Sequence, residues 1–139
     1  MPLPLEDRLA IHELIALHGH LVDDGDLHRL DELLTPDIVY DLDDFGRSPL
    51  IGIAAFRDAA LALGPANPVA HHVTNVVVTA SDADSAQVRS KGLGVTVDGS
   101  CGSVTYDDVV VRTPDGRRIS RRRVSARRVP LNGAREPGS

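Results

Sequence analysis

The sequence is poor in aromatic residues and in cysteine. It has no tryptophan, two tyrosines and two phenylalanines, and Cys101 is its single cysteine. A lone cysteine excludes an intrachain disulfide and gives no sign of an oxidising compartment. With so few aromatic rings, the core of this 139-residue chain has to be built from leucine, valine, isoleucine and alanine. A chain of this length fits one domain around one core.

The sequence also lacks a long apolar run and an excess of basic residues. No segment approaches the roughly 18 consecutive apolar residues of a membrane span, and residues 1–7 do not have the pattern of a secretory leader. We therefore predict no membrane partner and a cytoplasmic location. The formal net charge of −5 argues against a general nucleic-acid partner.

Helical periodicity dominates the first half of the chain. Between residues 5 and 22, apolar residues recur at spacings of three, four and seven, which predicts an amphipathic helix. An acidic corner at residues 23–26 ends it, and Asp26 is placed to cap a second helix that runs through residue 34. A third helix is predicted over residues 54–63, because this segment is rich in alanine and leucine.

The second half of the sequence is typical of strands. Runs with the composition and alternation of strands occur at residues 37–42, 71–79, 86–97, 102–113 and 118–129. Helices followed by strands indicate the α+β class, with three N-terminal helices packed on a strongly curved, mostly antiparallel sheet that encloses a cone. We predict one domain over residues 1–131 and a disordered tail over residues 132–139.

Five short motifs follow one another along the chain. They are Asp23-Asp24-Gly25-Asp26, Leu34-Thr35-Pro36-Asp37, His71-His72-Val73-Thr74-Asn75, Tyr106-Asp107 and Asp115-Gly116. In order and spacing they resemble the SnoaL-like family of the NTF2-like superfamily, whose members include scytalone dehydratase, bile-acid 7-alpha-dehydratase and polyketide cyclases. The resemblance spans nearly the whole chain. It implies a cone-shaped cavity for a hydrophobic small molecule, and a homodimer or higher homo-oligomer.

The resemblance also implies a pair of catalytic residues. In the dehydratase relatives, an aspartate at the end of the first helix and a histidine at the start of a later strand act together as acid and base. These positions correspond to Asp23 and His72, with Asp24 and His71 as alternatives one residue away. An imidazole titrates near neutral pH and a carboxylate fixes its tautomer, so such a pair suits proton abstraction. A turn role for Asp23 and a hydrogen-bonded core role for His72 are the alternatives.

Three further residues are predicted to hold a substrate. His18 lies on the apolar stripe of the first helix and should face the cavity, either as a ligand contact or as a satisfied buried histidine. Tyr40 shares the inward parity of its strand, where its hydroxyl can bind a substrate oxygen or its ring can simply pack. Arg122 can bind an anionic or carbonyl group if its side of the strand faces the cone.

A run of arginines near the C-terminus invites a nucleic-acid interpretation. Strand alternation divides these side chains between two faces, which weakens that interpretation. One set is expected to meet acidic residues such as Asp41, Asp43 and Asp44, or a dimer partner. The arginines of the run are Arg117, Arg118, Arg121, Arg122, Arg123, Arg127 and Arg128.

The leading hypothesis is a cofactor-independent lyase or isomerase, of the dehydratase, cyclase or double-bond isomerase type, that acts on a hydrophobic cyclic metabolite. The alternative is a non-catalytic small-molecule-binding or assembly domain. Val22 and Leu42 stand where scytalone dehydratase has pocket tyrosines, so its substrate does not transfer. We predict no cofactor and no metal site, since the neighbouring His71 and His72 point to opposite faces of a strand.

Overall fold

The structure is a computed structural model that describes residues 3–134. Residues 135–139 of the predicted disordered tail lie outside the described residues, whereas residues 130–133 form a short turn, η4. The elements are α1 (Leu5–Asp23), η1 (Leu27–Glu32), β1 (Leu34–Asp41), η2 (Asp43–Phe45), β2 (Leu50–Ile51), α2 (Ile53–Leu63), η3 (Gly64–Ala66), β3 (Ala70–Ser81), β4 (Ser85–Val95), β5 (Cys101–Thr113), β6 (Gly116–Ala126) and η4 (Pro130–Gly133).

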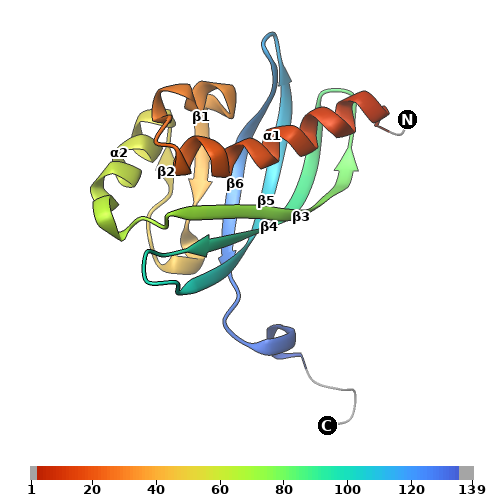
Figure 1. Ribbon diagram of the computed structural model, residues 1–139. Coiled ribbons are helices and arrows are strands. Elements are labelled where there is room, and N and C mark those ends of the chain that lie inside the picture. Colours follow the sequence, from red (N-terminus) through yellow and green to blue (C-terminus); the bar gives the residue numbers. More distant parts are fainter. Residues whose placement is uncertain (1–2, 135–139) are drawn as a thin grey trace.

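The six strands form one mixed sheet in the order β2-β1-β6-β5-β4-β3. The β1–β6 pairing is parallel, and the other four pairings are antiparallel. Figure 1 shows α1 crossing one face of this sheet next to β3, while α2 lies at the end formed by β1 and β2. The predicted α+β class, with N-terminal helices on a mostly antiparallel sheet, is confirmed. No helix within residues 3–134 is both long enough and apolar enough to cross a membrane.

Three details of the predicted fold were wrong. The predicted second helix is the six-residue 3₁₀ helix η1, because the chain turns extended at Leu34 to bury consecutive leucines in the core. The two-residue strand β2 was not predicted, since two residues carry no alternation. The sheet is also not strongly curled, so it does not close into the predicted cone.

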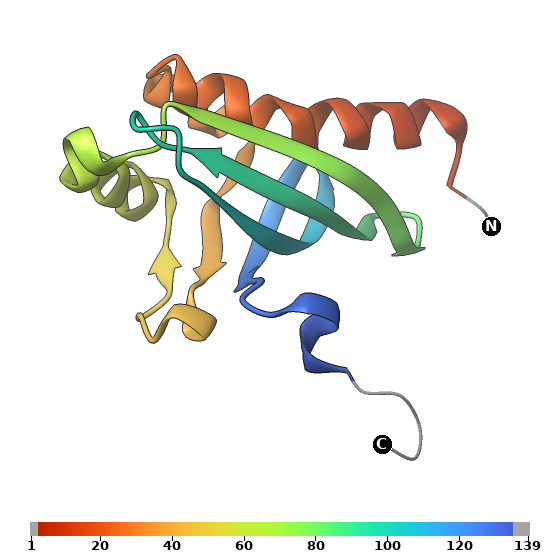
Figure 2. The same ribbon diagram turned by 60° about the horizontal axis from the view of Figure 1, so that its bottom comes forward.

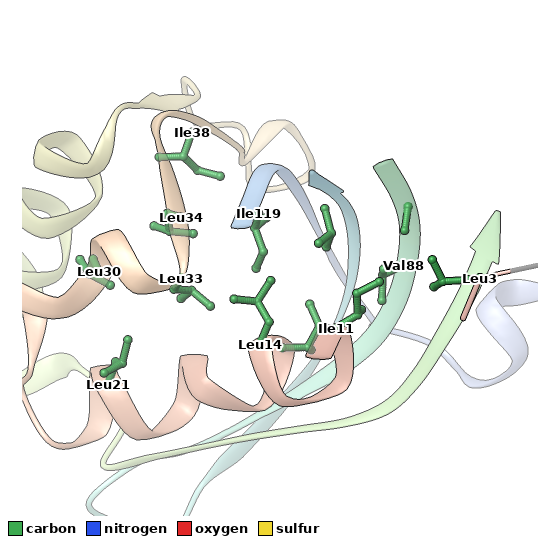
Figure 3. Close-up of a cluster of buried hydrophobic side chains, with 13 residues drawn as sticks. Leu3, Ile11, Leu14, Leu21, Leu30, Leu33, Leu34, Ile38, Val88 and Ile119 are labelled. Atoms are coloured by element: carbon green, nitrogen blue, oxygen red, sulfur yellow. The ribbon is translucent and has the colours of Figure 1, made fainter. Parts of the chain in front are cut away.

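Aliphatic side chains fill the space between α1 and the sheet. Figure 3 shows residues from α1, the η1 segment, β1, β4 and β6 converging on one cluster. The α1 contribution follows the helical spacing predicted from the sequence, with Ile11, Leu14, Ile15 and Leu21 buried on a single stripe. This packing fixes α1 against the sheet and so sets the position of the C-terminal end of α1, where the candidate site lies.

Two leucines of α1 test how much the buried stripe contributes to stability. Leu21 is 1% exposed and Leu9 is 60% exposed. We expect Leu21→Ala to lower the free energy of unfolding by about 2–5 kcal/mol, because it removes buried methyl groups and leaves a cavity. Leu9→Ala makes the same chemical change in the same helix and should cost less than about 0.5 kcal/mol. Urea denaturation of both variants measures the difference, and equal losses would contradict this packing.

Candidate active site

A cavity of about 400 Å³ lies between the C-terminal half of α1, α2 and the sheet. Its volume falls within the range of about 300–1,000 Å³ that is typical of small-molecule sites. Most of its surface is apolar, and its polar side chains are two histidines, two tyrosines, Arg47 and Asn67. It is lined by His18, Val22, Tyr40, Leu42, Arg47, Leu50, Phe56, Ala59, Ala60, Ala62, Leu63, Asn67, Pro68, His71 and Tyr106.

Asp23 and His71 form a close pair at one wall of this cavity. The backbone N–H of His71 donates to Asp23 Oδ2 at 2.8 Å, and ring nitrogen Nδ1 lies 2.6 Å from Oδ1. A carboxylate can only accept here, so Nδ1 carries the hydrogen and Nε2 of the neutral ring keeps a free lone pair. Asp23 is the last residue of α1, where the helix dipole disfavours a negative charge. Its position is explained by the contact with His71 and not by capping.

His72 does not line the cavity, and Asp23 contacts His71 in its place, so the predicted pairing was wrong by one residue. Successive strand side chains point to opposite faces, and in β3 His71 is partly buried while His72 is exposed. Asp24, the other alternative, is not the carboxylate that contacts His71. His71 shares the inward parity of Val73, two residues on, and this parity was the signal in the sequence that would have selected it.

A glycine allows β3 to approach α1 closely enough for this contact. Gly19 is buried in α1, one helical turn before Asp23. A Cβ atom at position 19 would collide with the backbone carbonyl oxygen of His71. The absence of a side chain at this position therefore brings the start of β3 within hydrogen-bonding distance of the end of α1.

Behind the cavity wall, His18 belongs to a buried ionic network. Arg122 donates from Nε and Nη2 to the two carboxylate oxygens of Asp108, at 2.7 and 2.8 Å. Its Nη1 lies 2.7 Å from Nδ1 of His18. A guanidinium only donates, so Nδ1 accepts and the hydrogen of His18 sits on Nε2. Burial lowers the pKa of His18 well below its ordinary value, and the charge of Arg122 lowers it further, so this ring is neutral.

Arg122 was predicted to touch the substrate, and the structure places it elsewhere. It is fully buried, does not line the cavity, and stacks 4.0 Å from the ring of Tyr106. Burial opposes its charge, but the carboxylate of Asp108 outweighs that effect and raises the pKa of Arg122. Arg122 therefore acts on the cavity through His18, whose tautomer it fixes. The prediction held only if the side of β6 that carries Arg122 faces inward. Arg122 does face inward, but its side chain does not reach the cavity.

Two tyrosines also line the cavity. Tyr40 faces the cavity, as its parity in β1 predicts, and its ring centroid lies 5.0 Å from that of Phe56. Tyr106 also lines the cavity, although the sequence pointed to it only as part of a motif and not as a site residue. Burial raises the pKa of both tyrosines, so their hydroxyls keep their hydrogens and can donate to a substrate oxygen. Alternation of Tyr106 with Asp108 and Val110 marks the inner face of β5.

A second hollow of about 510 Å³ adjoins the cavity and shares four lining residues with it. Asp23 and Asp24 line it, but no histidine or tyrosine does. The cavity that holds both imidazoles and both phenols is therefore the candidate active site. Within residues 3–134, no three His, Cys, Asp or Glu side chains are grouped closely enough to hold a metal ion.

The lowered pKa of His18 has a measurable effect on stability. A histidine that stays neutral when folded but titrates normally when unfolded binds fewer protons in the folded state. Its contribution to stability is complete above its unfolded pKa of about 6.5, and it is lost as the pH falls below that value, by at most about 1.4 kcal/mol per pH unit. His18→Asn keeps an acceptor for Arg122 and removes the titration. We expect its unfolding free energy to fall less steeply below pH 6.5 than that of the wild type, in urea melts.

Comparisons with known proteins agree with this architecture. A family model for the SnoaL-like domain matches residues 4–123. The chain is 32% identical to a proposed aromatic ring hydroxylase from Novosphingobium aromaticivorans DSM, over 92% of this chain and 94% of that one, with a TM-score of 0.77. It is 33% identical to an NTF2-like protein with a cystatin-like fold from the same organism, over 94% and 85% of the two chains, with a TM-score of 0.73.

A more distant structure shows the fold alone. A proposed scytalone dehydratase from Novosphingobium aromaticivorans DSM 12444 is 20% identical, over 89% of this chain and 86% of that one, with a TM-score of 0.74. A search among curated proteins found no match. These likenesses bear on fold and family, whereas the chemistry of the site has to be argued from its residues.

Proposed function

Since the chain belongs to the SnoaL-like family, we propose that it is a cofactor-independent lyase or isomerase that moves a proton on a hydrophobic cyclic substrate. His71 is the base, and Asp23 is the residue that positions it. The observation that carries this proposal is the Asp23–His71 contact of 2.6 Å, which leaves Nε2 of the imidazole free at the wall of a largely apolar cavity. A histidine held by a carboxylate is suited to take a proton near neutral pH.

The first step would be removal of a proton from a carbon next to a carbonyl group. The electron pair of the broken C–H bond moves toward the carbonyl oxygen, which gains negative charge, and the proton binds Nε2 of His71. The Nε2–H of His18 and the hydroxyls of Tyr40 and Tyr106 are among the cavity groups that can donate to that oxygen. Donors that are fixed before the reaction stabilise such charge with little reorganisation.

The proton on His71 then has two possible destinations. Returning it to a different carbon completes a double-bond isomerisation. Giving it to a leaving hydroxyl group releases water and completes a dehydration. Asp23 stabilises the protonated imidazole in either case, because its carboxylate accepts from Nδ1 throughout. The same residues therefore support both reaction types.

The proposal is tested by hydrogen exchange on a cyclic ketone. In D₂O the wild-type protein should speed deuterium uptake at the carbons next to the carbonyl of 2-tetralone, followed by NMR. The control is free imidazole at six equivalents per protein, which matches the six histidines of the chain. An exchange rate no higher than with this imidazole, for a ketone shown to bind, would count against the enzyme. Binding without exchange would instead support a non-catalytic binding domain, which the apolar Val22 and Leu42 in the lining also suit.

A further inference from the structure

The cavity has an uneven charge distribution. Among residues 3–134, no aspartate or glutamate lines it, and Arg47 is its single lysine or arginine. Asp23 lies behind His71 and lines the neighbouring hollow instead. A carboxylate entering the cavity would therefore meet no acidic side chain in the lining. It would meet a guanidinium at one position only.

The loop that carries Arg47 is held firmly against the end of β6. Asp44 accepts hydrogen bonds from the backbone N–H of Ala126 at 2.8 Å and from Nη1 of Arg128 at 3.1 Å. Arg128 also donates from Nη2 to the backbone carbonyl of Asp44 at 3.2 Å. These contacts, the bond from Ala126 first, lower the pKa of Asp44, so the anchor stays charged at neutral pH. Gly46 ends the turn in a left-handed conformation, with φ of 66°.

The side chain of Arg47 has no partner within the described part of the chain. Its backbone N–H bonds to Leu42, but its guanidinium makes no hydrogen bond or ion pair with any of residues 3–134. Other arginines of this region are paired, since Arg121 contacts Asp41 at 3.2 Å and Arg128 contacts Asp44 at 3.1 Å. Arg47 is thus a cation on an anchored loop, at the rim of an apolar cavity, with its donors available.

The two ends of the cavity differ in chemistry. Asp23 and His71 lie where the C-terminal end of α1 meets the start of β3. Figure 2 shows the η2 turn at the end of β1 that lies away from α1. A substrate that reaches both His71 and Arg47 would span a cavity whose lining also includes Leu42 and Leu50.

We propose that Arg47 binds a carboxylate on the substrate, so that the substrate class is an aromatic or alicyclic keto acid. The keto group of this substrate rests on the proposed function, whereas its carboxylate is inferred from Arg47 alone. A planar guanidinium suits a carboxylate because two parallel N–H groups can donate to its two oxygens. Arg47 is therefore a specificity-determining residue, and it takes no part in the proton transfer.

The test compares two probes that differ in charge. The probes are 2-naphthoate and its neutral amide, 2-naphthamide, and binding is measured by isothermal titration calorimetry. Arg47→Ala should weaken 2-naphthoate about 3- to 10-fold and change 2-naphthamide less than about twofold, as expected for a partly solvated ion pair. Arg47→Lys should lose less, because the positive charge remains. The control is Arg8→Ala, which removes an exposed arginine of α1 that does not line the cavity.

Three results would overturn the inference. These are an unchanged affinity of Arg47→Ala for 2-naphthoate, an equal loss for both probes, and no binding of 2-naphthoate to the wild type at millimolar concentration. The outcome is separable from that of the proposed function. The 2-naphthoate and 2-naphthamide measurements report binding alone, so a charge-selective loss in Arg47→Ala stands even if no ketone is exchanged.

Discussion

Replacing His71 with asparagine should lower the rate of ketone exchange by about 10²- to 10⁴-fold, the usual contribution of a general base. Asparagine keeps an N–H group near the position of Nδ1, which can still donate to Asp23, and it removes Nε2 and its lone pair. The contact that joins α1 to β3 is thereby preserved while the base is lost. The measurement is deuterium uptake by 2-tetralone per mole of folded protein, with circular dichroism to confirm that the variant is folded.

His72 provides the matched control for this experiment. His72→Asn makes the same change one residue away, on the exposed side of β3, and should leave the exchange rate within about twofold of the wild type. Asp23→Asn should also lower the rate, because an amide favours the wrong tautomer and does not stabilise the protonated imidazole. If His72→Asn abolished exchange and His71→Asn did not, the assignment of the base would be wrong.

The difference between these two histidines illustrates how far the sequence determines the site. The stripe of α1 and the order of the longer elements follow from periodicity, because burial of one face is the dominant favourable contribution to folding. The meeting of the end of α1 with the start of β3 is implied by the family resemblance and not by periodicity. A shift of one residue along a strand reverses every side chain. Choosing His71 over His72 therefore required parity along β3, in which His71 and Val73 share one face, and not mere adjacency to the first apolar residue.

The network behind His18 was harder to predict from the sequence. Arg122 and Asp108 lie on strands β6 and β5, and they face each other only because the two strands pair Asp108 with Arg122. A register shift lies between Val109 and Val110, opposite Ile119 and Arg121. A bulge of this kind adds one residue to β6, so strict alternation along the strand no longer predicts which face a side chain takes. A buried arginine among six others in the same run has no local signal, since its partner is 14 residues away.

Arg122 is also a residue whose loss should lower stability strongly. Arg122→Leu leaves the carboxylate of Asp108, itself 3% exposed, buried without its partner. Breaking a buried ion pair from one side costs about 3–5 kcal/mol, against a typical total stability of about 5–15 kcal/mol. We expect urea denaturation of this variant to show a loss in that range. Arg121→Leu, which removes an exposed arginine of the same strand, should cost less than about 1 kcal/mol.

A double variant separates the structural role of Arg122 from its role at His18. Arg122→Leu combined with Asp108→Leu removes both charges, and apolar replacement of a whole buried pair is often neutral or stabilising. Stability should therefore return to within about 2 kcal/mol of the wild type. Ketone exchange should stay impaired, because no donor then holds Nδ1 of His18 as an acceptor and the Nε2–H tautomer is no longer enforced. Full recovery of exchange in the stable double variant would show that Arg122 serves folding alone.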